Sequence, residues 1–164
     1  MEKNSPWGQR LSEAFVREFE SRGGVVAGRQ KFEPGQADHT ADVKKLLNIS
    51  SSEQRRKRLQ TVLGQKLKFS VRRRNDVDFI FLAGNAQDAR YIVPLAKFYR
   101  AHDLPIYATS SAFTGKFNKL SDEDLKGLEF TDLPWLLDGQ LRLQAEQAAK
   151  LKALADAKAA AERP

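Results

Sequence analysis

The 164-residue sequence contains no cysteine. This absence excludes disulfides, a thiolate nucleophile, a sulfur-rich zinc site and a lipidated N-terminal cysteine within these residues. It is compatible with either an oxidising or a reducing compartment, so it does not choose between them.

Long apolar runs are also missing. The longest covers residues 79–83, far short of the roughly 20 residues that a membrane-spanning helix needs. The first six residues, MEKNSP, lack the apolar core of a signal peptide. The sequence as written would therefore stay in the cytoplasm.

Groups that could carry catalysis are few. The two histidines, His39 and His102, fall in predicted loops without further metal ligands nearby, so each is expected on the surface. No Gly-x-Ser-x-Gly elbow, phosphate-binding P-loop or dinucleotide fingerprint occurs. We therefore predict that the protein is not an enzyme and that it has no cofactor and no metal site.

What the sequence does contain is the pattern of one α/β domain. Hydrophobic residues make up 41% and charged residues 30%, which is ordinary for a globular protein. Ser5-Pro6 predicts the start of a helix that ends at residues 23–24, followed by a short strand at residues 25–27. No strand is expected before this first helix. Two further helices are predicted, one over residues 42–47 capped by Thr40 and one capped by the serines at 50–52 that ends at residue 64.

The second half contains the strongest strand, VDFIFLA at residues 77–83. Its near-continuous hydrophobicity predicts burial on both faces of a parallel sheet. A helix over residues 87–101, a strand at 104–108 and a short strand at 128–130 are expected to follow. We divide the chain into a single α/β lobe, residues 1–137, and an Ala/Lys-rich helical tail, residues 138–164.

Polar side chains follow two of the predicted strands. Asn85 comes after the first, and Thr109, Ser110 and Ser111 come after the second. Because ligands of open α/β sheets bind at the carboxyl ends of the strands, these four residues are candidates to line a cleft. The alternative is that Asn85 only caps its helix and that the hydroxyl residues only turn the chain.

Positive charge is concentrated in two clusters. The net charge is +7, and much of it comes from arginines that we take as a candidate interaction face: Arg55, Arg56, Arg58, Arg72, Arg73 and Arg74. A solvated basic face and a contact with an acidic protein partner both remain open. Nucleic-acid binding is a weaker alternative, because Phe69 is the only aromatic residue among these cations.

Several blocks of the sequence resemble one known family. They are RRRNDVDFIFLAGNAQDAR at residues 72–90, DLPIYATS at 103–110, DLKGLEF at 124–130 and DLPWLL at 132–137, with WGQR at 7–10 upstream. From about residue 7 to residue 137 the chain looks like the C-terminal domain of the LppC/LpoA outer-membrane lipoproteins, which activate penicillin-binding proteins.

This resemblance implies a fold like that of type I periplasmic binding proteins, which have two α/β lobes around a cleft. It also implies a non-catalytic regulator of peptidoglycan synthesis that activates a bifunctional penicillin-binding protein from the periplasmic side of the outer membrane. The implied partner is that synthase. Nucleic acid is not expected as a partner, and a membrane is expected only through a lipid anchor that these residues do not contain.

The chain also departs from the family. It has no lipidation site, and the strand that should precede its first helix is expected upstream of Met1. We therefore expect a truncated piece that holds mainly one lobe of an incomplete fold. Two alternative functions remain from the residues themselves, a periplasmic lobe that binds a small ligand and a basic nucleic-acid-binding module.

Overall fold

The computed structural model describes residues 1–115, 122–132, 146–147 and 149–151. The chain divides into two compact units, Met1–Phe130 and Thr131–Pro164. In the second unit the described residues of 146–151 are helical. The predicted domain boundary at residue 137 and most of the predicted tail lie outside the described residues.

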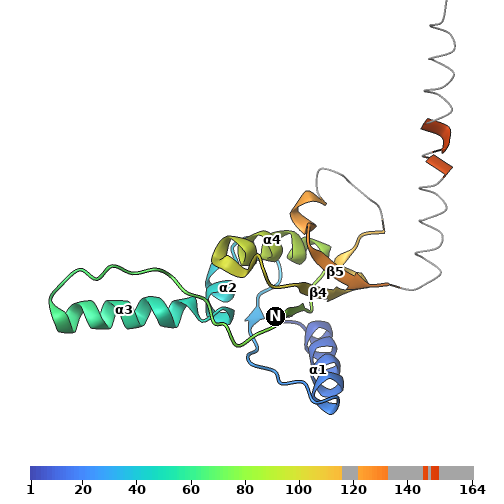
Figure 1. The fold of residues 1–164 in the computed structure, drawn as a ribbon. Helices are drawn as coiled ribbons and strands as arrows, with labels where there is room; N and C mark the ends of the chain where they lie inside the picture. Colours follow the sequence, from blue (N-terminus) through green and yellow to red (C-terminus); the bar gives the residue numbers. More distant parts are fainter. Residues whose placement is uncertain (116–121, 133–145, 148, 152–164) are drawn as a thin grey trace, which may run out of the picture. The chain divides into compact units, whose positions relative to one another are not determined.

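The first unit is built around parallel strands (Figure 1). The strands of the sheet are β1 (Glu2–Lys3), β2 (Lys31–Phe32), β3 (Ile80–Leu82), β4 (Ile106–Thr109) and β5 (Leu128–Thr131). β1 pairs in parallel with β2, β3 pairs in parallel with β4, and β5 lies beside β4. An isolated parallel bridge between Glu2 and Ala83 joins β1 to β3, so the strand order is β2-β1-β3-β4-β5. The predicted α/β class with a parallel sheet is confirmed.

The expectation that no strand precedes the first helix was wrong. β1 begins at the second residue, and its backbone bonds to both neighbouring strands. The Glu2 amide donates to the Gln30 carbonyl at 2.9 Å, and the Lys3 amide donates to the Ala83 carbonyl at 3.0 Å. A strand of two charged residues has no hydrophobic alternation, which is why no local pattern indicated it.

The strand predicted at residues 25–27 was also misplaced. Those residues are irregular, and the Val25 side chain is 84% exposed. β2 lies further along the chain, where the Gln30 and Phe32 carbonyls accept backbone bonds from Glu2 and Asn4. Pairing with β1 therefore sets the position of this strand, against the local preference of the two valines for strand structure.

Helices cover both faces of the sheet. The helices of the first unit are α1 (Pro6–Ser21), α2 (Thr40–Leu46), α3 (Ile49–Leu63), which projects from the fold, and α4 (Ala86–Ala96). In Figure 1, α1 lies below the strands and α4 lies above them, with α2 packed against α4. Successive residues of β3 serve the two layers: Phe81 stacks on Phe15 of α1 at 3.8 Å, whereas Ile80 and Leu82 join the buried core that also contains Ile92 of α4.

Two of the four predicted helix caps are confirmed. The Ser5 hydroxyl accepts from the Gly8 amide at 3.1 Å, and Asn85 caps α4. The other two were wrong by one or two residues. Thr40 is the first residue of α2 and follows His39, and α3 begins after Asn48, whose backbone is left-handed (φ 58°). The turn at Asn48 directs the chain into α3 before the serines are reached.

The helix predicted over residues 87–101 is interrupted. α4 ends at Ala96 and continues as a π-helical turn, Lys97–Ala101, in which Arg100 has φ 65°. The strands predicted after it are confirmed as β4 and β5. Within the described ranges, no helix is long and apolar enough to cross a membrane.

His39 was wrongly expected at the surface. Its side chain is 1% exposed, and its ring meets the Phe32 ring edge-on at a centroid distance of 5.2 Å. The loop after β2 folds over the end of that strand, which buries the imidazole. His39 Nδ1 has no hydrogen-bond partner among the described residues, and the nearest Asp42 carboxylate oxygen is 3.8 Å away. His102 is exposed, as predicted.

Candidate functional site

The carboxyl edge of the sheet is the candidate site. β1 and β3 are neighbours, and the helices that follow them, α1 and α4, leave toward opposite faces. Such a switch point, where the strand order reverses and the following helices go to opposite faces, is where open α/β sheets hold their ligands. Both helices begin at this edge, with Ser5 and Asn85 as their capping residues.

A network of hydrogen bonds fixes the β3–α4 turn at this edge. The Asn85 side chain accepts from the Asp88 amide at 3.0 Å, and the Asp88 carboxylate accepts from the Asn85 amide at 2.9 Å. The same carboxylate pairs with Lys3 Nζ at 2.9 Å. Asp88 is buried and Lys3 nearly so, which means that this ion pair holds the end of β1 against the start of α4.

The hydroxyl residues after β4 reach the same turn. Ser111 Oγ donates to the Gly84 carbonyl at 3.0 Å and lies 2.8 Å from Thr109 Oγ1. Ser110 opens a short 3₁₀ turn, Ser110–Ala112, and is exposed, as is Asn85. The structure thus brings the four predicted residues to one edge. Their capping and turn roles are visible, and their role toward a ligand stays a prediction.

Sequence reasoning missed Lys3 and Asp88 at this edge. A local signal for Asp88 was present, because Asn85-x-x-Asp88 is the spacing of a reciprocal capping box. Lys3 gave no such signal, since it meets Asp88 across 85 positions of sequence.

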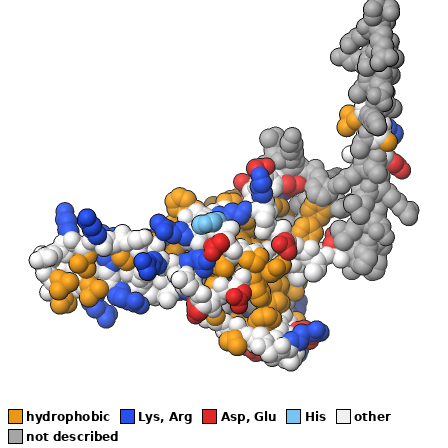
Figure 2. Space-filling view, viewed as in Figure 1, with side chains coloured by type: hydrophobic (Ala, Val, Ile, Leu, Met, Phe, Trp, Pro, Cys, Tyr) orange, Lys and Arg blue, Asp and Glu red, His pale blue; other side chains and the backbone are white. Residues whose placement is uncertain are grey.

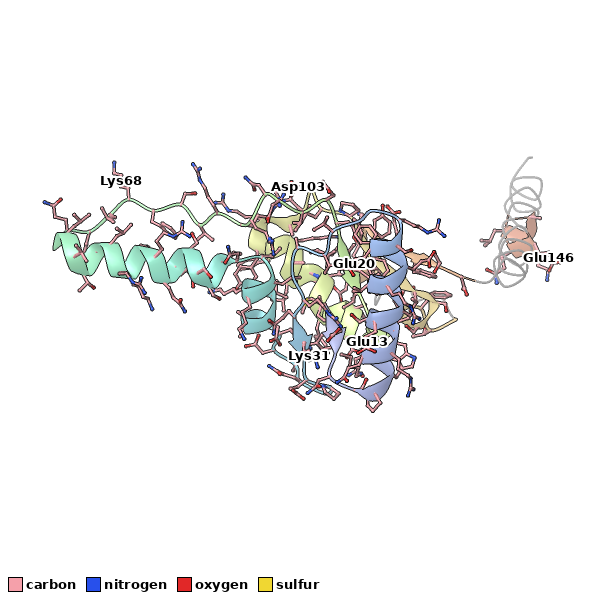
Figure 3. All side chains as sticks on the ribbon, turned by 90° about the horizontal axis from the view of Figure 1, so that it is seen from below. Glu13, Glu20, Lys31, Lys68, Asp103 and Glu146 are labelled. Carbon is pink, nitrogen blue, oxygen red and sulfur yellow. The ribbon has the colours of Figure 1, made fainter. Side chains whose placement is uncertain are left out.

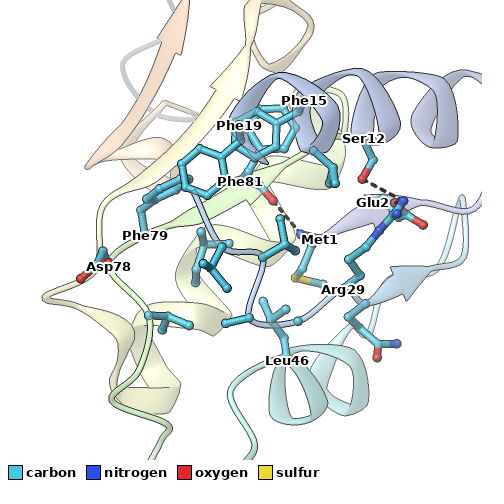
Figure 4. Close-up of a pocket in the computed structure, with 18 of the residues that line it drawn as sticks. Met1, Glu2, Ser12, Phe15, Phe19, Arg29, Leu46, Asp78, Phe79 and Phe81 are labelled. Carbon is cyan, nitrogen blue, oxygen red and sulfur yellow. Dashed lines mark hydrogen bonds and ion pairs between the residues drawn. The ribbon is translucent and has the colours of Figure 1, made fainter. Parts of the chain in front are cut away.

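A separate cavity of about 130 Å³ lies between α1, the chain before β2 and the chain that enters β3 (Figure 4). Its apolar wall is an aromatic cluster in which Phe15 and Phe19 face Phe79 and Phe81. Its polar wall contains Glu2, Ser12 and Arg29. None of the four predicted cleft residues lines this cavity.

Glu2 is the buried charge of that polar wall. Arg29 donates to its carboxylate at 2.7 Å, and Lys31 lies 3.9 Å away. Burial by itself raises the pKa of the Glu2 carboxyl, but hydrogen bonds from Arg29 and Ser12 outweigh burial and hold the pKa below its ordinary value. Glu2 is therefore ionised, and its carboxylate is already paired with Arg29 within the cavity wall.

The predicted basic face belongs to a projecting arm. We call residues 49–74, which comprise α3 and the extended segment that returns from it, the basic arm. Arg55 and Arg72–Arg74 line one groove between α3 and the returning segment. The Arg56 guanidinium lies over the Phe69 ring, 5.2 Å from its centre.

Two of the six predicted arginines are engaged at the base of the arm. Arg73 bonds to Asp103 and to the Arg100 carbonyl, and Arg74 makes two 2.7 Å hydrogen bonds to Asp76. Those two bonds lower the pKa of the Asp76 carboxyl to about 2. Arg73 and Arg74 therefore anchor the arm, while Arg55, Arg56, Arg58 and Arg72 are exposed.

Metal binding finds no support in the described residues. Across residues 1–115, 122–132 and the described part of 146–151, no three His, Asp or Glu side chains come together as metal ligands. The candidate site is a surface of helix caps, hydroxyl groups and one buried ion pair.

Comparisons with known proteins agree on the family. A family described as "LppC putative lipoprotein" matches residues 1–163. A relative from Vibrio antiquarius, "Penicillin-binding protein activator LpoA", is 24% identical over 140 residues, which cover 85% of this chain and 23% of the relative. The protein of the same name from Photobacterium profundum is 25% identical over 141 residues, with 84% and 22% covered. The chain thus spans less than a quarter of the length of these relatives.

The fold has a counterpart among solved structures. A "putative branched-chain amino acid ABC transporter" from Rhodospirillum rubrum superposes with a TM-score of 0.54 at 22% identity. The match covers 79% of this chain and 30% of the transporter component. The α/β fold is therefore that of a periplasmic-binding-protein-like lobe, as predicted.

Proposed function

Since this chain belongs to the LppC lipoprotein family, we propose that it is a non-catalytic regulator that binds and activates a bifunctional penicillin-binding protein. The observation that carries the proposal is the family match over residues 1–163. Two relatives are named as penicillin-binding protein activators, and these names indicate the kind of partner and the activating role that we propose.

The chemistry of the carboxyl edge supports regulation over catalysis. The polar groups there are joined in pairs and caps: Lys3 with Asp88, Asn85 with the start of α4, and Ser111 with Gly84. A catalytic acid, base or nucleophile needs a free group aimed at a substrate. A rigid edge with exposed Asn85 and Ser110 instead suits contact with another protein.

The family also suggests where such contact takes place. Proteins of a lipoprotein family are held at a membrane, and a peptidoglycan synthase works in the periplasm. We therefore place the proposed contact on the periplasmic side of the outer membrane, with the synthase as the partner.

Binding to a purified bifunctional penicillin-binding protein tests the proposal. We expect Ser110→Arg to weaken the affinity about tenfold or more, because a bulky cation would have to be desolvated at the carboxyl edge. Ser51→Arg, which adds the same cation to an exposed site on α3, is the matched control and should leave the affinity unchanged. Biolayer interferometry with the immobilised synthase measures both. Equal affinities for the two variants would show that the synthase does not contact this edge. Absence of binding by the unaltered chain would overturn the proposal.

A further inference from the structure

The basic arm projects from the end of the lobe opposite the candidate site. Its base is fastened at two places: the Arg74 amide donates to the carbonyl of Leu47, at the end of α2, at 3.0 Å, and Arg73 pairs with Asp103, in the segment that leads into the amino end of β4. Only Ile49 of α3 is buried, so the helix extends away from the core (Figure 1). Figure 3 shows the returning segment, marked by Lys68, alongside α3.

This arm accounts for the basic character of the chain. Residues 49–74 contain nine Lys and Arg but one acidic residue, Glu53. The rest of the chain therefore has 19 basic and 20 acidic residues. Glu53 is itself engaged, since it pairs with Lys44 of α2 at 3.1 Å. The positive excess is thus confined to one projecting element and is not neutralised within it.

Most of the cations on the arm are available to a partner. Seven are exposed and make no hydrogen bond or ion pair among the described residues: Arg55, Arg56, Lys57, Arg58, Lys66, Lys68 and Arg72. Of these, only Arg56 lies over an aromatic ring, that of Phe69. Consecutive residues of a helix are about 100° apart, so the run Arg55–Arg58 places positive charge on every side of α3. Figure 2 shows blue side chains above and below the arm.

The distal end of the same helix is apolar. Leu59, Val62 and Leu63 are 45%, 75% and 55% exposed, and their i, i+3, i+4 spacing puts them on one side of α3. In Figure 2 hydrophobic side chains gather at this end of the arm, between the cations. Exposed aliphatic side chains next to unpaired cations are the features of a segment that lies at a membrane interface.

We propose that the basic arm binds the surface of an anionic phospholipid bilayer. A helix that sinks into the fluid headgroup layer is met by phosphates at its base and along both flanks, whereas one rigid acidic protein face would meet only one side of it. A nucleic acid would leave the apolar end without a partner, and Phe69, which could stack on a base, is covered by Arg56. The bilayer alone uses both the cations and the aliphatic side chains. This inference goes beyond the proposed function and does not depend on the synthase.

Co-sedimentation of the full chain with phosphatidylglycerol vesicles tests the inference. Each Lys or Arg near an anionic surface contributes ~1 kcal/mol, about fivefold in affinity, so the triple variant Arg55→Gln, Lys57→Gln, Arg58→Gln should bind about a hundredfold more weakly. Added salt should weaken binding of the unaltered chain, because it screens these charges. The double variant Val62→Ser, Leu63→Ser should lose about tenfold in affinity, from the apolar contact.

The matched control removes three exposed cations from α1 and its C-terminal cap. The triple variant Arg10→Gln, Arg17→Gln, Arg22→Gln should keep the affinity of the unaltered chain. All altered side chains are exposed, so circular dichroism should show the same fold in every variant. Equal binding to phosphatidylcholine vesicles, or equal losses in the two triple variants, would overturn the inference. So would binding to duplex DNA or polyglutamate without binding to the vesicles.

Discussion

We expect Lys3→Met to lower the free energy of unfolding by about 3 kcal/mol, because the substitution leaves the Asp88 carboxylate buried without its cation. The Lys3 and Asp88 side chains are 16% and 7% exposed, and their closest atoms are 2.9 Å apart. Breaking a buried ion pair on one side costs about 3–5 kcal/mol, and the partial exposure of Lys3 places this pair at the low end. Urea denaturation followed by circular dichroism measures the change.

A double-mutant cycle separates the pair from other effects. Asp88→Ala should destabilise the protein as well, because it also removes half of the capping box. The two changes together should cost clearly less than the sum of the single costs. Lys126→Met is the control, since the Lys126–Glu123 pair is 78% and 71% exposed and should contribute at most about 0.5 kcal/mol. Additive single effects at Lys3 and Asp88 would show that the pair does not hold this edge together.

Gly8→Ala should destabilise the protein by about 1–3 kcal/mol, although alanine is the better helix former by about 1 kcal/mol. Gly8 is buried in the first turn of α1, and a Cβ there would come within 2.4 Å of the Lys3 carbonyl oxygen. The first turn of α1 would have to move away from β1 to admit it. Thus the sign of the effect reports on packing of α1 against the end of β1.

The same urea experiment decides the sign. Arg10→Ala, at an exposed position one residue beyond that turn, is the control and should change the stability little. If Gly8→Ala stabilised the protein, as helix propensity alone would have it, α1 would not pack on β1 as described.

Long, strongly patterned elements were predictable from the sequence. The apolar run around β3 and the Asn85 cap of α4 are both present, because each depends on residues close together in the chain. The charged cluster on α3 was equally visible. These features follow from periodicity and capping, which are local properties.

Elements that depend on distant partners were not predictable. β1 and β2 contain two residues each. They are strands only because their backbones hydrogen-bond to one another and because β1 also bonds to Ala83. The burial of His39 likewise requires Phe32 beneath its ring, in a loop that has no apolar pattern of its own. Tertiary contacts thus overrode local preference at both places.

In the candidate site, too, local features were predictable from the sequence and long-range contacts were not. The sequence alone placed Asn85, Thr109, Ser110 and Ser111 at one edge, because parallel strands end together. The ion pair that closes this edge joins Lys3 to Asp88, and no pattern in the sequence links two residues so far apart. Likewise, the basic arm projects because residues 64–74 return to the lobe alongside α3. The number of charges in the sequence does not indicate this path of the chain.

The rate of glycan-strand polymerisation by a purified bifunctional penicillin-binding protein tests the central claim most directly. We predict that adding this chain raises the rate until binding is saturated, and that Ser51→Arg does the same while Ser110→Arg requires a higher concentration. An unchanged rate at concentrations that saturate binding would contradict the claim that the chain is an activator.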